Sequence, residues 1–116
     1  MKLFVTIVFD PNMVDEIINA FNKKNIHGST IIIASGMASI LLKNGLNSDD
    51  EVVFGTLRKL LNNQSEEHAL ILTVLEDNLV DIAIEVVEEV IGNLEEAGTG
   101  ICFSIKLDFV KGVYHE

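Results

Sequence analysis

Cysteine, proline, tryptophan and basic residues are scarce in this chain of 116 residues. It has one cysteine, one proline and no tryptophan, and only eight lysines and arginines against eighteen acidic residues. The single cysteine, Cys102, has no partner in the chain for a disulfide, and we expect it to be a small, buried apolar residue of a strand. One proline and 48% hydrophobic residues predict a globular chain and exclude a disordered one.

Charge and hydropathy exclude two classes of partner. A net charge of −10 argues against nucleic acid, because lysine and arginine are what hold phosphates. No apolar run reaches the roughly 18 residues that span a bilayer, and the first residues lack the basic segment and cleavage site of a secretory signal. We therefore expect a cytoplasmic protein without membrane insertion. Two explanations of the negative charge are possible. It could keep an oligomer with an apolar interior soluble, or it could form an acidic recognition face, and we favour the first.

Three expected strands are apolar on both faces. They are residues 3–9, 30–34 and 69–75. A strand half-buried in a monomer alternates apolar and polar residues, whereas a continuous apolar run indicates that both faces are covered. A fourth expected strand, residues 101–107, does alternate, with apolar residues at the odd positions and cysteine, serine and lysine at the even ones. The predicted helices are enough to cover one face of the sheet. The simplest way to cover the second face is another copy of the same chain.

Two amphipathic helices are expected between these strands. The first begins at Asp10 and Pro11, a capping residue followed by a proline at the first helical position. The second begins near Asp77 and is stopped by Gly92. The order is strand, helix, strand, then a middle segment, then strand, helix, strand. It predicts an α+β fold, the ferredoxin-like double βαβ unit, with a four-stranded antiparallel sheet and both helices on one face.

The connection between the second and third strands is the unusual part of the chain. A hairpin needs a few residues, whereas residues 37–67 form a connection of about thirty, and such long connections are usually functional. Residues 48–51 fit a capping box, and the apolar positions after them recur at helical spacing. We therefore expect one domain, residues 1–116, with residues 37–67 inserted as loop and helix. The apolar residues of this helix are candidates for contact with a partner protein: Leu57, Leu60 and Leu61.

Four short stretches, in their order and spacing, carry a resemblance to a known family. They are the first strand running into Asp10 and Pro11, Ile-His-Gly-Ser-Thr at residues 26–30, Gly36 after the second strand, and Gly98-Thr99-Gly100 followed by Ile-Cys-Phe. With these stretches in place, the chain resembles the PII family of nitrogen-regulatory signal proteins over nearly its whole length except the middle segment. In that family a long mobile loop begins near the position of Gly36, and a glycine-rich phosphate loop precedes the fourth strand.

The resemblance implies a homotrimer whose uncovered sheet faces line its centre. It also implies a non-catalytic signal-transduction protein, a regulator of nitrogen use that contacts a transporter or an enzyme through residues 37–67. An adenine nucleotide would bind in the cleft between subunits, with the adenine near Val8, Thr30 and Gly36 and the phosphates near Gly98, Thr99 and Gly100. Glycines suit phosphates because backbone N–H groups without side chains approach an anion closely.

The chain also departs from the family at the positions that hold the outer phosphates. ATP-binding members carry basic residues there, and this chain has Ser39, Ile101 and Gly112. Each lost charge-assisted hydrogen bond removes about 1.5–3 kcal/mol, so we expect AMP or ADP rather than ATP. Residues 37–67 contain no tyrosine, so the uridylylation known in the family is not expected.

Other chemistry finds little support in the sequence. The three histidines and Cys102 lack the mutual spacing of metal ligands, and we expect His27 to be a turn residue. The acidic residues 49–51 and 66–67 fit a solvated helix start better than a cation site. No Ser/His/Asp or Cys/His set has the spacing for covalent catalysis, so we expect no catalytic residues, no metal ligands and no enzyme.

Alternatives remain open for the ligand residues and for the function. The glycines at 98 and 100 also suit an ordinary turn before a strand, and Thr30 also suits a plain β-branched strand position. A metal-handling trimer like the copper-tolerance CutA proteins would share the same fold plan, because a fold does not define a function. A scaffold with a vestigial ligand site is the third interpretation.

Overall fold

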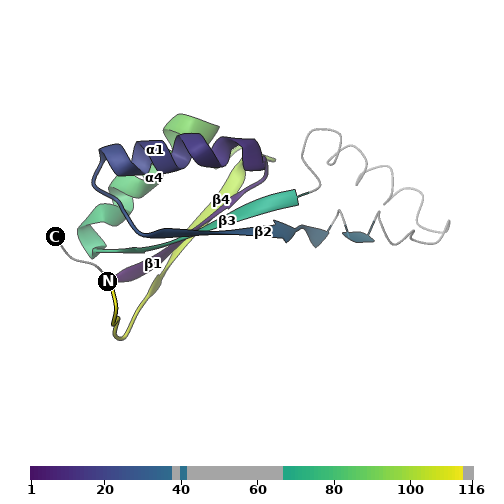
Figure 1. Cartoon of the computed structure of the whole chain (residues 1–116). Helices are drawn as coiled ribbons and strands as arrows, with labels where there is room; N and C mark the ends of the chain where they lie inside the picture. Colours follow the sequence, from purple (N-terminus) through teal and green to yellow (C-terminus); the bar gives the residue numbers. More distant parts are fainter. Residues whose placement is uncertain (38–39, 42–66, 114–116) are drawn as a thin grey trace.

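A four-stranded antiparallel sheet forms the base of the fold, and two helices pack on one of its faces (Figure 1). The computed structural model describes residues 1–37, 40–41 and 67–113. The strands are β1 (Lys2–Val8), β2 (Ser29–Ser35), β3 (Glu67–Leu75) and β4 (Gly100–Lys106). The helices are α1 (Val14–Lys23) and α4 (Val80–Ile91), preceded by the 3-10 turns η1 (Pro11–Met13) and η3 (Asp77–Leu79). The predicted α+β class, strands and helices are thus confirmed, and the strand ends differ by at most two residues.

The helix boundaries follow the signals seen in the sequence. The Asp10 carboxylate accepts a hydrogen bond from the backbone N–H of Asn12 at 3.0 Å, which satisfies one free donor at the start of the helical segment. Gly92 has a φ of 96°, a conformation that favours glycine. Its N–H donates to the carbonyl oxygen of Glu88 at 3.0 Å. This is the last helical bond, and the positive φ of Gly92 ends α4 where the sequence predicts.

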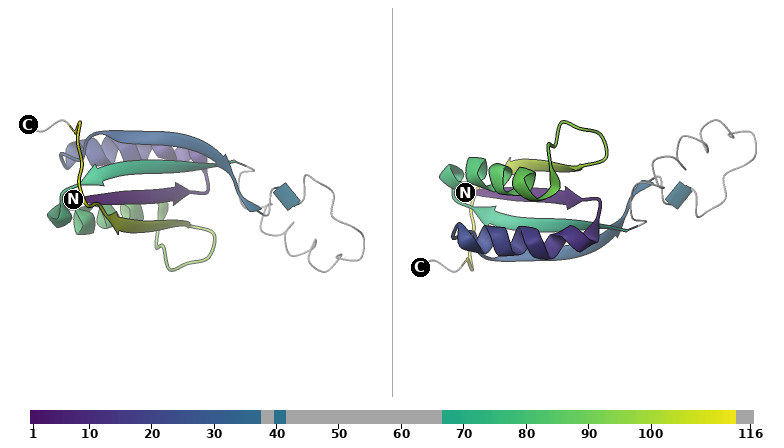
Figure 2. Two further views of the ribbon diagram at one scale, coloured as in Figure 1. Left: turned by 90° about the horizontal axis from the view of Figure 1, so that it is seen from below. Right: turned by 90° about the horizontal axis from the view of Figure 1, so that it is seen from above.

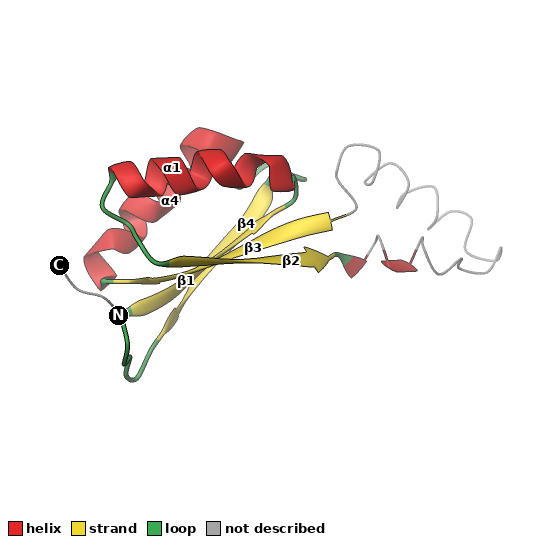
Figure 3. Cartoon of the chain, in the orientation of Figure 1, coloured by secondary structure: helices red, strands yellow, loops and turns green. Residues whose placement is uncertain are grey.

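The strand order in the sheet is β2-β3-β1-β4, and all neighbouring strands are antiparallel. β1 is therefore central, while β2 and β4 form the two edges. Figure 2 shows α1 lying along the β2 side of the sheet and α4 along the β4 side. Figure 3 shows that the helices lie on a single side of the strands.

The register decides which side chains face the helices. Thr6 lies opposite Ile71 on one side and Cys102 on the other, and this row points toward the helices. Because neighbouring residues of a strand alternate between the two faces, the next row, with Val5 opposite Leu72 and Phe103, points away from them. The buried core lies between the sheet and the helices and contains Phe4, Val8, Ile17, Phe21, Ile71, Ala83, Val86 and Val87.

Two threonines are buried in this core. The Thr73 hydroxyl lies 2.8 Å from the Ser29 hydroxyl on the neighbouring strand, so the two groups satisfy each other. The Thr6 hydroxyl oxygen has no hydrogen-bond partner among the residues that the structure describes. A buried hydroxyl without a partner is destabilising, so Thr6 lowers the stability of the folded chain.

The opposite side of the sheet carries no helix in the described part of the chain. We call this side the open face. Its residues, read from the strand register, are Leu3, Val5, Ile7, Thr30, Ile32, Ala34, His68, Leu70, Leu72, Val74, Ile101, Phe103 and Ile105. None of them is an acid, a lysine or an arginine. The sequence-based expectation that one sheet face stays apolar and uncovered therefore holds for the described residues.

Most of the predicted insertion lies outside the described residues. Its described members are Met37, Ile40, Leu41 and Glu67, and Glu67 is already the first residue of β3. The predicted partner-contact residues also fall outside the description: Leu57, Leu60 and Leu61. Within residues 1–37, 40–41 and 67–113, no helix has the length and apolar character needed to cross a bilayer.

Candidate ligand site

The expected phosphate loop leads into β4 beside the end of β1. Gly98 has a φ of 79°, Thr99 is half-buried, and Gly100 is the direct register partner of Val8. A Cβ atom on Gly100 would lie 2.9 Å from the carbonyl oxygen of Ile7 and 3.0 Å from the Ile91 side chain. Close packing therefore requires glycine at position 100 whether or not a ligand binds.

The second expected contact, Gly36, lies at the same end of the sheet, just beyond β2. A Cβ atom there would lie 2.6 Å from Cε1 of His68, so the imidazole occupies the space above this glycine. The His68 ring also contacts the Phe9 ring, with their centroids 4.9 Å apart. Sequence analysis considered His68 only as a metal ligand and missed this packing role, for which the chain gives no local signal.

Val8 and Thr30 point to opposite sides of the sheet. The Val8 side chain is 1% exposed and belongs to the core under the helices, so only its backbone is available to a ligand. Thr30 is exposed on the open face, opposite Leu72. The two residues therefore do not line a common pocket within one chain.

Gly36 lies apart from the expected phosphate contacts, although Val8 is next to Gly100. Gly36 follows β2 and Gly100 begins β4, at opposite edges of the sheet. Three strand spacings of about 4.8 Å place these edges about 14 Å apart.

Two of the positions where ATP-binding PII proteins carry basic residues are described by the structure, and both are uncharged here. Ile101 lies on the open face, and Gly112 follows β4 in an exposed turn with a φ of 95°. Lys111, beside it, is exposed. The third position, Ser39, falls outside the described residues. Leu107 donates to the carbonyl oxygen of Met1, so Lys111 follows β4 at the end of the sheet opposite Gly100. Within one chain the expected phosphate loop therefore offers backbone N–H groups, and Lys111 is not beside it.

Metal and thiol chemistry find no site in the described residues. Searching residues 1–37, 40–41 and 67–113 finds no group of three or more His, Cys, Asp or Glu side chains that could hold a metal ion. Burial raises the pKa of the Cys102 thiol, and the nearby Glu88 carboxylate raises it further. Cys102 is half-buried against the core, as a small apolar residue at an edge strand would be.

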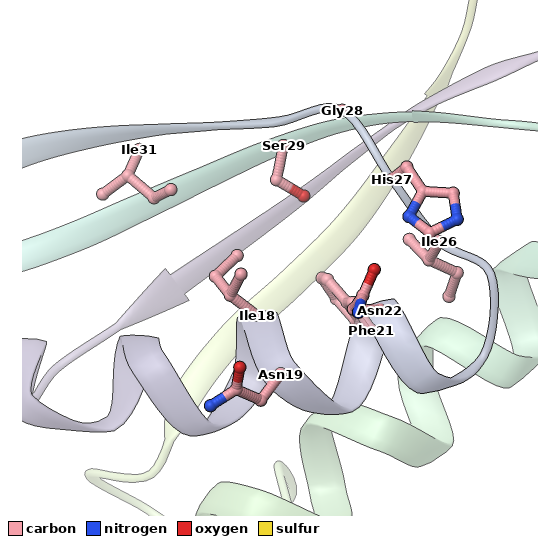
Figure 4. Close-up of a pocket in the computed structure, with 9 residues that line it drawn as sticks. All are labelled: Ile18, Asn19, Phe21, Asn22, Ile26, His27, Gly28, Ser29 and Ile31. Carbon is pink, nitrogen blue, oxygen red and sulfur yellow. The ribbon is translucent and has the colours of Figure 1, made fainter.

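A cleft of about 320 Å³ lies between α1 and the start of β2 (Figure 4). Its lining residues are Ile18, Asn19, Phe21, Asn22, Ile26, His27, Gly28, Ser29 and Ile31. Four of them belong to the stretch 26–30, which sequence analysis used only as a family match. His27 is exposed in the connection between α1 and β2, which confirms the expected turn position.

Comparison with known proteins adds no family to these observations. No protein-family model matches the chain, and no curated protein matches it.

Proposed function

We propose that this protein is a cytoplasmic, homotrimeric and non-catalytic regulator of the PII type, which senses a small ligand between its subunits. The observation that carries the proposal is the open face. It is a continuous apolar surface across all four strands, and a protein in water rarely leaves such a surface exposed.

The orientation of β4 supports an assembly on the open face. An amphipathic edge strand normally turns its apolar side toward its own core. In β4 the apolar residues Ile101, Phe103 and Ile105 point away from the helices and are 44% to 49% exposed, while Ser104 and Lys106 lie on the helix side. The apolar side of β4 therefore suits a second core, which on this proposal other copies of the chain complete.

The number of copies and the fold family come from the resemblance. The strand order β2-β3-β1-β4, with both helices on one face, fits the ferredoxin-like double βαβ unit. PII proteins use this unit in a trimer with the bare sheet faces at its centre.

The proposed ligand is an adenine nucleotide with few phosphates, AMP or ADP. The loop at Gly98, Thr99 and Gly100 can donate backbone N–H groups to a phosphate. Ile101 and Gly112 stand where ATP-binding relatives have basic residues, so outer phosphates would lose charge-assisted bonds of about 1.5–3 kcal/mol each. Losing two such bonds weakens a micromolar ATP site to about millimolar.

Two measurements test the proposal. Light scattering with size-exclusion chromatography should give the mass of a trimer at micromolar concentration, and a stable monomer would refute the assembly. Calorimetric titration of AMP, ADP and ATP in parallel should show that ATP gains nothing over the smaller nucleotides. If none of them binds at millimolar concentration, the nucleotide part of the proposal is wrong. If ATP binds at low micromolar affinity and far above AMP, another cation replaces the missing ones.

The proposed partner contact is tested by deleting residues 47–64. We expect the trimer to persist and a co-purified transporter or enzyme to be lost, because this segment is proposed to contact the partner. Collapse of the trimer after the deletion would instead show that the segment belongs to the assembly.

A further inference from the structure

Among the residues that the structure describes, His68 is the only side chain of the open face that can change its charge. The other residues of that face are apolar, except Thr30 with its neutral hydroxyl. Histidine is the residue type that gains a charge as the pH falls from about 8 to about 5. The open face can therefore acquire a positive charge in weak acid, whereas the rest of it stays uncharged.

The contacts of His68 hold its ring on this face. Its register partner on β2 is Ala34, and its ring lies against the ring of Phe9, which follows β1, with the centroids 4.9 Å apart. The ring also lies over Gly36, where a Cβ atom would be 2.6 Å from Cε1. None of these three neighbours is charged, so none of them offsets a proton on the imidazole.

Of the described carboxylates, Glu67 and Asp10 are closest to this aromatic pair along the chain. Glu67 precedes His68 in β3, and the alternation of the strand directs it to the helix side. Asp10 follows Phe9 and accepts its hydrogen bond from Asn12 at the start of the helical segment. The Phe9 ring contacts His68 within one chain, with or without other copies, so it does not link protonation to assembly. A cover of the open face by other copies does, because it removes water from the imidazole.

We propose that protonation of His68 separates the assembly into single chains, so that weak acid converts the trimer into monomers. The inference rests on the proposed function, because it needs the open face to be the interface, and it adds a regulation of that interface. Covering the face removes water from the imidazole, and a charged group loses more on desolvation than a neutral one. The single chain therefore binds the proton more tightly than the trimer does, so acid favours the single chain. In a symmetric trimer every subunit contributes this effect.

Light scattering over a dilution series of the full chain, at pH 8 and at pH 5.5, tests the proposal. Ordinary carboxylates stay ionised across this interval, so histidines are the groups that titrate. The unaltered chain should be a trimer at pH 8, and the protein concentration at half dissociation should rise at least tenfold at pH 5.5. His68→Gln, which cannot be protonated, should abolish this shift. His27→Gln is the matched control, an exposed histidine between α1 and β2, and should keep the shift.

A second variant separates the charge from the acidity. His68→Lys carries a positive charge at pH 8 and should dissociate there with the circular dichroism of the unaltered chain, because position 68 is only half-buried. Equal dissociation of the unaltered chain at both pH values, a shift that persists in His68→Gln, or a stable trimer of His68→Lys would overturn the proposal and leave the assembly intact. A monomer at pH 8 would instead refute the assembly, and this inference with it.

Discussion

Replacing Phe103 by glutamate tests whether the open face is an interface. Phe103 lies in the middle of β4 on that face, opposite Val5 of the central strand. Its side chain is 44% exposed in the single chain. A substitution there leaves the core under the helices untouched, so the variant should fold and change only its assembly.

The magnitude follows from the burial. Complete burial of a phenylalanine contributes about 1.5–3 kcal/mol, so covering the 44% of Phe103 still exposed contributes about 1 kcal/mol for each subunit. A glutamate at this position also brings a carboxylate into an apolar contact, which costs several kcal/mol unless it is paired. A combined loss of about 4 kcal/mol raises the dissociation constant about a thousandfold.

Sedimentation or light scattering at micromolar concentration measures the effect. Phe103→Glu should sediment as a monomer with the circular dichroism of the unaltered chain. Ser104→Glu introduces the same charge one residue along the strand on the helix side, where Ser104 is exposed, and should leave the mass unchanged. An unaltered mass for Phe103→Glu, or equal dissociation by both variants, would refute the assignment of the open face as an interface.

Three further predictions concern the core and the thiol. Thr6→Val should raise the free energy of unfolding by about 1 kcal/mol in urea titrations, because it removes an unpartnered hydroxyl, whereas Thr73→Val should lower it by a similar amount by breaking a bonded pair. Gly100→Ala should lower it by about 1–3 kcal/mol, since the added carbon meets a backbone oxygen of β1 that cannot rotate away. Cys102 should react with iodoacetamide at pH 8 more slowly than a free thiol, and Glu88→Gln should speed the reaction by lowering the thiol pKa; an unchanged rate would contradict that cause.

The strands and helices could be predicted because local signals define them. Asp10 and Pro11 mark the start of the first helical segment, and Gly92 ends α4, each through contacts within a few residues. The three apolar strands also predicted apolar residues on both sheet faces, and the strand register places them there. Alternation in β4 showed that its two sides differ, but the side that faces the helices depends on pairing with β1, a long-range contact that no local pattern contains.

The candidate site was harder to predict from the sequence, because it too depends on contacts between residues far apart in the chain. The resemblance to the PII family implied that Val8 and Gly36 lie near a common ligand, while the fold buries the Val8 side chain and packs His68 against Gly36. The cleft beside β2 combines α1 residues with strand residues that meet only after folding.

The packing of the glycines decides how the proposed nucleotide site is tested. Gly100 is required by its close contact with the backbone of β1, so replacing it alters the fold and says nothing clear about a ligand, whereas a side chain at Gly36 would displace the His68 ring. Thr99 lies between Gly98 and Gly100, is only half-buried and belongs to no strand. Changes at Thr99 therefore separate ligand binding from folding better than changes at the glycines. A nucleotide affinity that responds to Thr99→Ala at constant stability would support the loop as a phosphate contact, and an affinity that follows only the stability of Gly100→Ala would assign the loop to packing alone.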